Sequence, residues 1–570
     1  MNYIIALICL LTSQLHEGVC WNSEGTEFIT AFMQSLTTSM TIPDFRLAIT
    51  ALQPSTTVRV IIYNRSSEII RSLEEQVTIT VPIPTNTELQ GTVLSSRNTI
   101  IVRSDKPVTV VSYNYKSCTA DSATIFPVNT LGTEYYIFAP IKSIGSPEFT
   151  VINYNQTNEI HVMLTGFVTY NGTNYRSGDN VTIILSAFEA VQLQSNVSLT
   201  GTRIMSQYPI AVVSGNNCDK YYTYCDLLFE QLIPLKDWGK TFLVSSLAVQ
   251  NYNDTVTIIA SQTTEIQYTT GGMSSNIILQ KGNYSEIILL PNYSLVITAT
   301  QPVMVMYTFV GGEYNGSLFD PFIMNIIPSE SFSNFYIINT EIHVNNYVRV
   351  IAKNSVLLES FSGNNTVLNT SKWNFMTGTE YAWTNIVIGS DNKNFTLQQC
   401  SPFAAYIYGI KHCIGIGTTA PAVNRTPHCA DFNVDVAVTV TSLANGSIQV
   451  NWTKNACADS YLLQLFLANN LSLLEEKIVN GSSFLFIGPY NHSLYNLRVR
   501  PMLAGETCLP QEEQFIHLGK RTTVIAQAFV DVIGRNLIDP AAIAKALENK
   551  TYFLLNALSP YIKVRVKPAN

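Results

Sequence analysis

Residues 208–242 read YPIAVVSGNNCDKYYTYCDLLFEQLIPLKDWGKTF, and the pattern in this stretch recurs along the chain. Pro209 precedes the apolar run Ile210–Val213, which predicts a short strand that is buried on both faces. Ser214–Asn217 predicts a turn, because Gly and Asn adopt positive φ at little cost. An apolar segment then leads to Gly239, where a new strand is expected.

A proline followed by an apolar run occurs four times, with spacings between 93 and 102 residues, at Pro107, Pro209, Pro302 and Pro402. A second segment that predicts a strand begins at Gly25, Gly132, Gly239 and Ser333. Related strands are expected at Thr57–Ile61, Phe149–Ile152, Thr255–Ile258 and Tyr347–Val350. A period near 100 residues is longer than a solenoid or single-blade repeat, and it suits one small β-domain per unit.

The sequence therefore predicts an all-β protein built from tandem β-sandwich-like repeats of about 100 residues. The four β-units are placed at residues 21–131, 132–237, 238–331 and 332–419. Repeats in tandem suit an extended extracellular rod better than an enzyme with an active-site cleft.

Three segments of the opening stretch, VVSGNNC, CDLLFEQLIP and WGKTF, resemble the N-terminal domain of IgG-Fc-binding proteins, which are large secreted components of mucus. GTEFITAFM and PVNTLGTEYY are similar to other recurring segments of that domain, and the resemblance covers about residues 22–418. It implies adhesion to an extracellular glycoprotein ligand, with immunoglobulin Fc and mucins as candidate partners. The von Willebrand-type modules that follow this domain in mucus members do not follow it here, so a gel-scaffold function is not implied.

Residues 1–20 are predicted to be a secretory signal peptide, because Ile4–Leu11 is apolar but too short to span a bilayer. The alternative is a buried N-terminal strand. No apolar tail of 18 or more residues follows the last predicted segment, so neither a membrane span nor a lipid anchor is expected. Only 13% of the residues are charged, against about 25% in an average soluble domain.

Glycans are expected to solubilise this weakly charged surface. Nineteen of the 49 asparagines lie in N-x-Ser/Thr sequons, about twice the number expected by chance. Asn424 is followed by Thr426-Pro427 and is set aside. The predicted glycosylation sites are Asn64, Asn155, Asn171, Asn180, Asn196, Asn253, Asn283, Asn292, Asn315, Asn364, Asn369, Asn394, Asn445, Asn451, Asn470, Asn480, Asn491 and Asn549. Such glycans mark exposed turns and also block association between sheet edges.

The cysteine count indicates an oxidising compartment. Ten cysteines become eight if Cys9 and Cys20 leave with the signal peptide, and an even number suits a disulfide framework. The expected pairs are Cys218–Cys225, Cys400–Cys413, Cys457–Cys508 and, from the remainder, Cys118–Cys429. The sequence alone leaves the pairing of the last four open, and cleavage before Cys20 would leave one thiol for an intermolecular bond.

The composition changes near residues 417–422, which predict a linker. Residues 430–510 then resemble a fibronectin type III module, with Trp452 as the buried core tryptophan and Tyr495 as the tyrosine of the E–F corner. Residues 520–570 predict a small α/β segment, whose helix starts at Asp539-Pro540.

Signatures of catalysis are missing from the sequence. It contains no G-x-S-x-G, H-E-x-x-H, P-loop or dinucleotide fingerprint, so we expect neither an enzyme nor a cofactor. His412-Cys413 and His428-Cys429 together with Cys400 could form a metal site, but disulfides are the better interpretation in a secreted chain. A net charge of −7 and a pI near 5.6 exclude the basic footprint of a nucleic-acid-binding protein.

The loop between Cys218 and Cys225 carries the candidate binding residues Tyr221, Tyr222 and Tyr224. Tyrosine supplies contact area with few rotatable bonds and is enriched at binding surfaces. The alternative is that these rings pack on the adjoining β-unit. The leading hypothesis is a secreted, glycosylated binding or adhesion protein; the alternatives are a self-associating structural coat or matrix protein and a hydrolase with a site between repeats.

Overall fold

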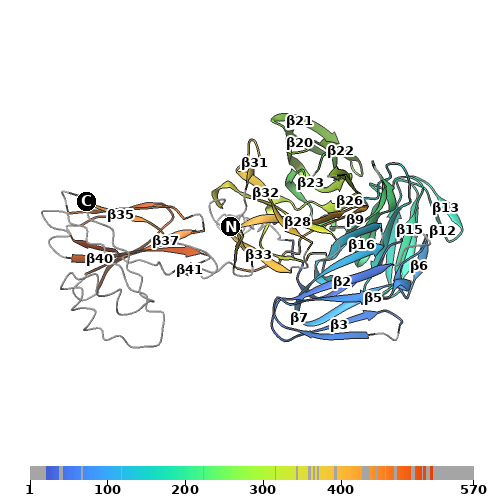
Figure 1. The fold of residues 1–570 in the computed structure, drawn as a ribbon, viewed down its shortest axis with the longest axis horizontal. Helices are drawn as coiled ribbons and strands as arrows, with labels where there is room; N and C mark the ends of the chain where they lie inside the picture. The colour runs from blue at the N-terminus through green and yellow to red at the C-terminus, as the bar shows by residue number, and fades with distance from the viewer. Residues whose placement is uncertain are drawn as a thin grey trace, which may run out of the picture. The chain divides into compact units, whose positions relative to one another are not determined.

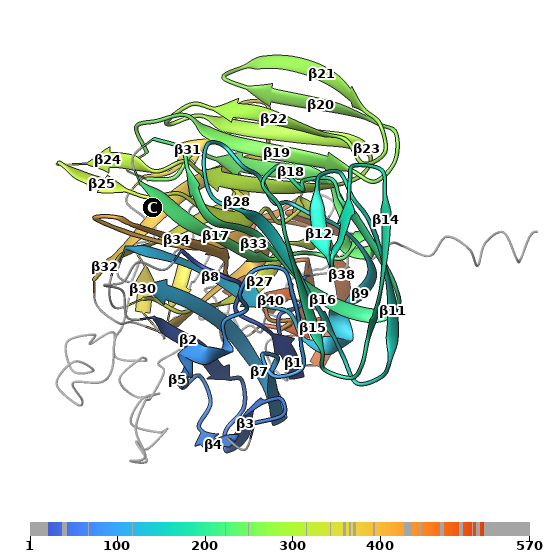
Figure 2. The same ribbon diagram turned by 90° about the vertical axis from the view of Figure 1, so that its right-hand side faces the viewer.

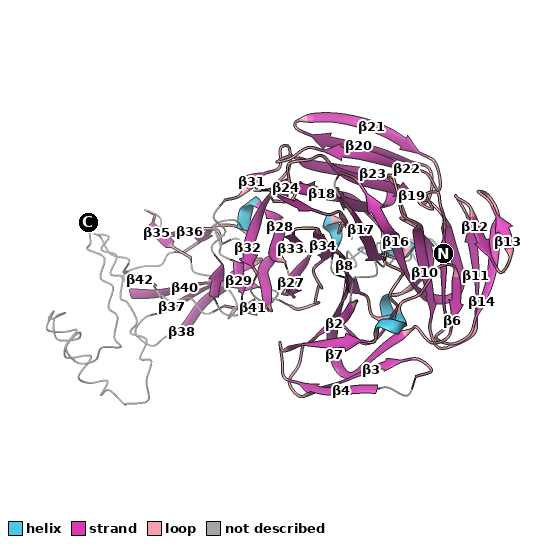
Figure 3. Cartoon of the chain, turned by 45° about the vertical axis from the view of Figure 1, so that its right-hand side comes forward, coloured by secondary structure: helices cyan, strands magenta, loops and turns pink. Residues whose placement is uncertain are grey.

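The computed structural model describes residues 21–517 except for 37–42, 66–67, 117, 223, 249, 315, 342–343, 357–360, 364–365, 369–371, 391–393, 427–435, 444–445, 456, 468–471, 489–493, 504 and 509–513. These residues form strands joined by turns and single-turn 3-10 helices, and none of them lies in an α-helix (Figure 3). The predicted all-β class is confirmed. The chain divides into two compact parts, residues 1–425 and 426–570, which are described separately below. The predicted signal peptide and the predicted α/β segment at 520–570 lie outside the described residues.

Four sheets follow one another in the first part (Figure 1). Sheet 1 contains β1 (Gly25–Thr30), β2 (Asp44–Ala51), β3 (Thr56–Ile62), β4 (Glu68–Leu73), β5 (Thr78–Ile83), β7 (Ile100–Lys116) and β8 (Thr119–Ile125). Sheet 2 contains β6 (Val93–Ser95), β9 (Gly132–Tyr136), β10 (Pro147–Asn153), β11 (Asn158–Met163), β14 (Asn180–Leu185), β15 (Ala190–Gln194), β16 (Arg203–Lys220) and β17 (Cys225–Gln231).

Sheet 3 contains β18 (Gly239–Ser245), β19 (Asp254–Ala260), β20 (Thr264–Thr270), β21 (Met273–Leu279), β22 (Tyr284–Leu289), β23 (Ser294–Phe309) and β26 (Phe322–Asn325). Sheet 4 contains β27 (Ser333–Ile338), β28 (Asn345–Lys353), β29 (Phe361–Gly363), β30 (Thr366–Leu368), β31 (Asn374–Phe375), β32 (Tyr381–Gly389), β33 (Phe395–Lys411) and β34 (Ile414–Thr419). Two further hairpins are β12–β13 (Val168–Tyr170 and Thr173–Tyr175) and β24–β25 (Gly312–Tyr314 and Ser317–Phe319).

Each sheet is organised around one long strand with a proline near its middle: β7, β16, β23 or β33. In β7, Ile100–Ser104 pairs with β1 and β3, whereas Val108–Lys116 pairs with β2 and β8. Pro107 lies where the partners change, because a proline lacks the N–H that a ladder requires. The apolar residues after each proline are buried, as the sequence predicts.

The two recurring sequence motifs meet in space. The residue that opens each short first strand pairs with the residue after the proline, as in Gly25↔Val108 and Gly132↔Ile210, and the register shifts between this pair and the next. Gly239↔Val303 and Ser333↔Phe403 repeat the arrangement. Segments that are 64 to 83 residues apart in sequence therefore form one junction in each sheet.

Two expectations about local structure are wrong. Ser214–Asn217 is not a turn but the buried continuation of β16, where Gly215 is needed because a Cβ there would lie 1.7 Å from the Leu228 carbonyl oxygen. In sheet 1, the counterpart of β10, β19 and β28 is β2, since it pairs with the second half of the long strand. The expected segment Thr57–Ile61 instead lies in β3, which pairs with the first half.

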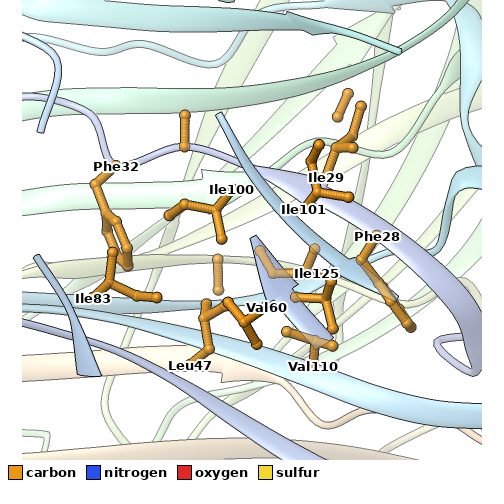
Figure 4. Close-up of a cluster of buried hydrophobic side chains, with 14 of the residues drawn as sticks. Phe28, Ile29, Phe32, Leu47, Val60, Ile83, Ile100, Ile101, Val110 and Ile125 are labelled. Atoms are coloured by element: carbon orange, nitrogen blue, oxygen red, sulfur yellow. The ribbon is translucent and has the colours of Figure 1, made fainter. Parts of the chain in front are cut away.

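The core of sheet 1 contains apolar residues from both halves of β7. Phe28, Leu47, Val60, Ile101 and Val110 pack there with no more than a few per cent of their surface exposed (Figure 4). The same cluster continues into sheet 2, so neighbouring sheets share apolar packing.

The four sheets close into a ring, which corrects the expected extended rod. Figure 2 shows the four sheets around a centre that contains β8, β17 and β34. The outer strands of sheet 1 lie below this centre, and those of sheet 2 lie to its right. The outer strands of sheet 3 lie above it, and those of sheet 4 lie to its left. Ser23, at the start of the first sheet, donates its backbone N–H to the Ala422 carbonyl at 2.9 Å, just beyond the fourth. The Arg46 guanidinium bonds the Glu341 carboxylate across the same junction at 3.1 Å.

The second part contains a two-sheet sandwich. One sheet has the order β35-β36-β39 (Val438–Ser442, Ile448–Trp452 and Ser483–Phe486), and the other contains β37, β38, β40, β41 and β42 (Ser460–Leu467, Ser472–Val479, Leu494–Leu503, Glu506–Thr507 and Gln514–His517). Trp452 is buried against Tyr461, with ring centroids 5.3 Å apart, and Tyr495 is buried in the same core. The fibronectin type III assignment remains a proposal.

Within the described residues, no helix is long and apolar enough to span a membrane.

Candidate functional site

The innermost strands of the four sheets, β8, β17, β26 and β34, meet at the centre of the ring. These strands do not pair with one another through backbone ladders among the described residues. Side chains instead cross between them and accept backbone N–H groups. We call this arrangement of four strands the hub.

Asp121 of β8 contacts all three other strands of the hub. Its carboxylate accepts the backbone N–H of Phe229 at 3.0 Å, of Gly417 at 3.2 Å and of Ile323 at 3.5 Å. It also accepts the N–H of its neighbour Ser122 at 2.8 Å. One buried side chain thus satisfies donors from β8, β17, β26 and β34, which would otherwise be unpaired in the interior.

Two acidic side chains of β17 act in the same way. Asp226 accepts the backbone N–H of Ala120 at 2.6 Å and of Gly415 at 3.3 Å. Glu230 accepts the backbone N–H of Asn325 at 3.2 Å. Sequence reasoning missed these residues, although acidic residues inside the segments TADSATI and CDLLFEQ, which are otherwise uncharged, were a visible signal.

Burial raises the pKa of Asp121, Asp226 and Glu230 well above the ordinary range of carboxyl groups. Desolvation is the largest cause for each, and the N–H groups that they accept oppose it. Their oxygen atoms are occupied by backbone donors, so the hub is a set of cross-links rather than an open reaction site. Among the described residues, no three His, Cys, Asp or Glu side chains are placed to hold a metal ion.

The hairpins that lead into the hub strands gather at one end of the hub, and we call this surface the hairpin face. The β33–β34 hairpin contacts two others there: Cys413 forms a disulfide with Cys118, and its backbone N–H donates to the Leu318 carbonyl at 2.9 Å. The β16–β17 hairpin adjoins them, because Leu227 donates its N–H to the Thr119 hydroxyl at 2.9 Å.

The three predicted binding tyrosines lie on this face but in different environments. Tyr222 and Tyr224 are 51% and 52% exposed. The Tyr222 ring stacks on Tyr252 of the β18–β19 loop, with centroids 4.5 Å apart. Tyr221 is half-buried, and desolvation, followed by the charges of Asp219 and Glu286, raises its pKa. Tyr221 therefore packs toward sheet 3, whereas Tyr222 and Tyr224 offer accessible surface.

Asp219 fixes the loop that carries these tyrosines. Its carboxylate accepts the backbone N–H of Lys142 at 2.9 Å and of Lys220 at 2.9 Å. Burial raises the pKa of Asp219 to about 6. The Cys218–Cys225 disulfide closes the base of the same loop, with Cα atoms 5.0 Å apart. The loop is thus held at both its base and its flank.

The disulfides correct part of the expected pairing. Cys118 bonds Cys413, so the expected pairs Cys118–Cys429 and Cys400–Cys413 are wrong. Cys413 faces Cys118 because closure of the ring brings the first and last hairpins together, which no local pattern indicates. Cys400, Cys457 and Cys508 are also disulfide-bonded. Cys429 lies outside the described residues.

The predicted glycosylation sites in the described part of the ring and sandwich lie at accessible positions. The exposed ones are Asn64, Asn155, Asn171, Asn180, Asn196, Asn253, Asn283, Asn292, Asn451 and Asn480, and Asn394 is half-buried. Asn315, Asn364, Asn369, Asn445, Asn470, Asn491 and Asn549 lie outside the described residues.

Comparison with known proteins identifies relatives of the ring. The model of the IgGFc binding protein family matches residues 121–409, just over half of the 570 residues. The IgGFc-binding protein of Homo sapiens is 26% identical over 402 residues, which are 70% of this chain and 7% of that protein. The chain therefore spans a small fraction of the length of this relative.

Solved structures give only weak similarity. The FN1–FN3 domains of chicken CNTN1 align over 50% of this chain and 99% of theirs, with a TM-score of 0.16 and 10% identity. A Ca2+-stabilized adhesin of an Antarctic bacterium aligns over 87% and 98%, with a TM-score of 0.12 and 8% identity. TM-scores this low do not establish a shared fold.

Proposed function

Because the chain belongs to the IgGFc binding protein family, we propose that it is a secreted, glycosylated protein that binds an extracellular glycoprotein. Disulfides and exposed sequons support an extracellular location, since disulfides form and persist in oxidising compartments.

The observation that carries the proposal is the pair Tyr222 and Tyr224 on the hairpin face. Both rings are about half exposed, on a loop closed by the Cys218–Cys225 disulfide and held by Asp219. A loop that is ordered before binding avoids the entropy cost of ordering at the interface, commonly about 0.5–1.5 kcal/mol per immobilised side chain. Tyrosine is also well suited to contact because it has large area and few rotatable bonds.

Immunoglobulin Fc is the first ligand to test, because the name of the human relative gives it. Mucins are the second. The chain covers 7% of that relative, so its ligand need not be the one bound by the whole human protein.

Binding of the secreted, glycosylated chain to immobilised Fc and to purified mucin tests this proposal. We expect the double substitution Tyr222→Ala and Tyr224→Ala to weaken binding by tenfold or more. The matched control is Tyr284→Ala, which removes a ring of 41% exposure on sheet 3.

Equal binding by the double variant and the control would place the site elsewhere on the chain. Self-association without any heterologous ligand, measured by analytical ultracentrifugation, would instead favour a structural coat or matrix protein.

A further inference from the structure

A cleft of about 500 Å3 lies between sheets 3 and 4. One wall contains the turns β20–β21 and β22–β23, including Asn292 and Tyr293. The other wall contains Trp373, Phe375 and Trp383 of sheet 4. Its volume is in the range of roughly 300–1,000 Å3 typical of small-ligand sites.

Polar groups line most of the cleft, and aromatic rings on both walls add apolar patches. Phe375 is 68% exposed and Tyr293 is 44% exposed. Asn374 and Thr377 lie among the rings and supply polar groups. This mixture matches a pyranose sugar, whose C–H face packs on aromatic rings while its hydroxyl groups need hydrogen-bond partners.

Trp383 is held in place by the side chain of Arg349. The Arg349 guanidinium lies 4.1 Å from the centroid of its ring, within cation–π distance. Arg349 is itself buried and donates to the Ser245 hydroxyl at 2.6 Å and to the side-chain Oδ1 of Asn385 at 2.8 Å. The Trp383 ring therefore lies on a guanidinium that is fixed by hydrogen bonds to both sheets.

Asn292, on the opposite wall, is a predicted N-glycosylation site. It begins the sequon Asn292-Tyr293-Ser294, is exposed, and has a positive φ of 65° at the tip of its turn. Its backbone N–H donates to the Ser246 hydroxyl at 2.7 Å, which fixes the turn. Among the described residues its carboxamide makes no hydrogen bond, so Nδ2 is accessible for attachment of a glycan.

We propose that the N-linked glycan of Asn292 lies in this cleft, with its first N-acetylglucosamine residues packed on Phe375 and Trp373. Attachment forms the bond between Nδ2 and the anomeric carbon; the amide loses one proton, and the diphosphate of the lipid-linked donor leaves. The glycan then bridges sheets 3 and 4 and covers the exposed rings. This inference rests on the proposed secretion and glycosylation of the chain.

Site-resolved release of glycans by peptide-N-glycosidase from the secreted protein tests the inference. The chain offers a matched control, because Asn283-Tyr284-Ser285 is the same sequon in the β21–β22 turn of the same sheet but does not line the cleft. We expect release from Asn292 to be at least tenfold slower than from Asn283 in the native protein and equal after denaturation.

Phe375→Ala should raise the native release rate at Asn292 and leave that at Asn283 unchanged. Because Phe375 is exposed, this variant is expected to fold. An unoccupied Asn292, equal native release at the two sites, or no effect of Phe375→Ala would each overturn the inference. Fc or mucin binding through the hairpin face would be unaffected by these results, so the two proposals fail independently.

Discussion

Asp121 shows how a charged residue can be a structural element of a β-protein. It lies in a strand with no exposed surface, where an unpaired carboxylate would cost several kcal/mol. Four backbone N–H groups from four strands donate to it. The residue replaces, with one side chain, the ladder hydrogen bonds that the four hub strands do not form with each other.

Asp121→Asn is expected to destabilise the ring by about 2–4 kcal/mol, because either orientation of the amide places its NH2 group against backbone donors. Asp179→Asn is the control, since Asp179 also accepts a backbone N–H, from Arg176, but in an exposed turn. Thermal unfolding of the two variants measures the difference. Equal melting temperatures would show that the hub does not depend on the Asp121 carboxylate.

Asp254 makes the stability of the ring depend on pH. It lies at the start of β19 and accepts hydrogen bonds from Gln250, from the Tyr307 hydroxyl and, at 3.1 Å, from the Val310 N–H. Burial raises its pKa to about 7, against an unfolded value near 4. A raised pKa means that the fold favours the protonated form, so this stabilisation is complete below pH ~4 and is lost as the pH rises through ~7.

The melting temperature of the ring is therefore expected to fall between pH ~4 and pH ~7. Asp254→Asn should reduce this fall, by up to about 4 kcal/mol of unfolding free energy at about 1.4 kcal/mol per pKa unit. The other buried carboxyl groups act in the same direction, so part of the pH dependence will remain. An unchanged pH dependence in the variant would exclude Asp254 as a titrating group.

At the scale of elements, the first strand of each sheet packs against the turn that follows the sheet. A Cβ on Gly25, Gly132 or Gly239 would lie 2.2–2.4 Å from the Cβ of Pro127, Pro234 or Pro328. Glycine at these positions therefore lets each first strand lie close to the connection that follows its own sheet. In the fourth sheet the corresponding residue is Ser333, whose hydroxyl bonds the Val423 carbonyl at 3.0 Å.

Gly132→Ala is expected to destabilise the ring by about 1–3 kcal/mol, since the added methyl overlaps Pro234. Gly481→Ala is the control, because the nearest atoms to its added methyl lie 3.9 Å away and its backbone is compatible with alanine. It should be neutral or stabilise its own part by about 0.4–1 kcal/mol. Denaturant unfolding measures both effects, with each variant compared with the unsubstituted chain in the transition of the part that carries the substitution. A neutral Gly132→Ala would contradict this account.

At the scale of the whole molecule, ring closure depends on contacts between the first and last sheets. The Cys118–Cys413 disulfide spans 295 residues, whereas Cys218–Cys225 spans 7. In the loop-entropy model the long loop constrains the unfolded chain by about 6 kcal/mol and the short one by about 2–3 kcal/mol. The two bonds therefore have different roles: one stabilises the ring, and the other shapes a surface loop.

Replacing Cys118 and Cys413 by Ser is expected to lower the melting temperature and increase proteolysis much more than replacing Cys218 and Cys225 by Ser. The second variant should remain folded but lose ligand binding, because its tyrosine loop is no longer ordered. Equal losses of stability in the two double variants would contradict the division of roles.

The sequence by itself determined the class of the fold and the position of most strands. Apolar runs after Pro107, Pro209, Pro302 and Pro402 predict buried strands, and the structure places each in the second half of a long strand. The Cys218–Cys225 pair was also accessible to sequence reasoning, and the structure contains that disulfide. These features depend on neighbours within a few residues, so their pattern is visible in the chain itself.

Only the tertiary structure decided how the sheets meet. The Asp121 carboxylate accepts a hydrogen bond from Gly417, 296 residues away in sequence, and Cys118 forms a disulfide with Cys413, 295 residues away. The tertiary structure also gives the three loop tyrosines different environments: Tyr221 packs toward sheet 3, whereas Tyr222 and Tyr224 remain exposed. Closure of the ring determines which residues face each other in these contacts. Each buried donor or acceptor there must form a hydrogen bond with a group that closure brings next to it.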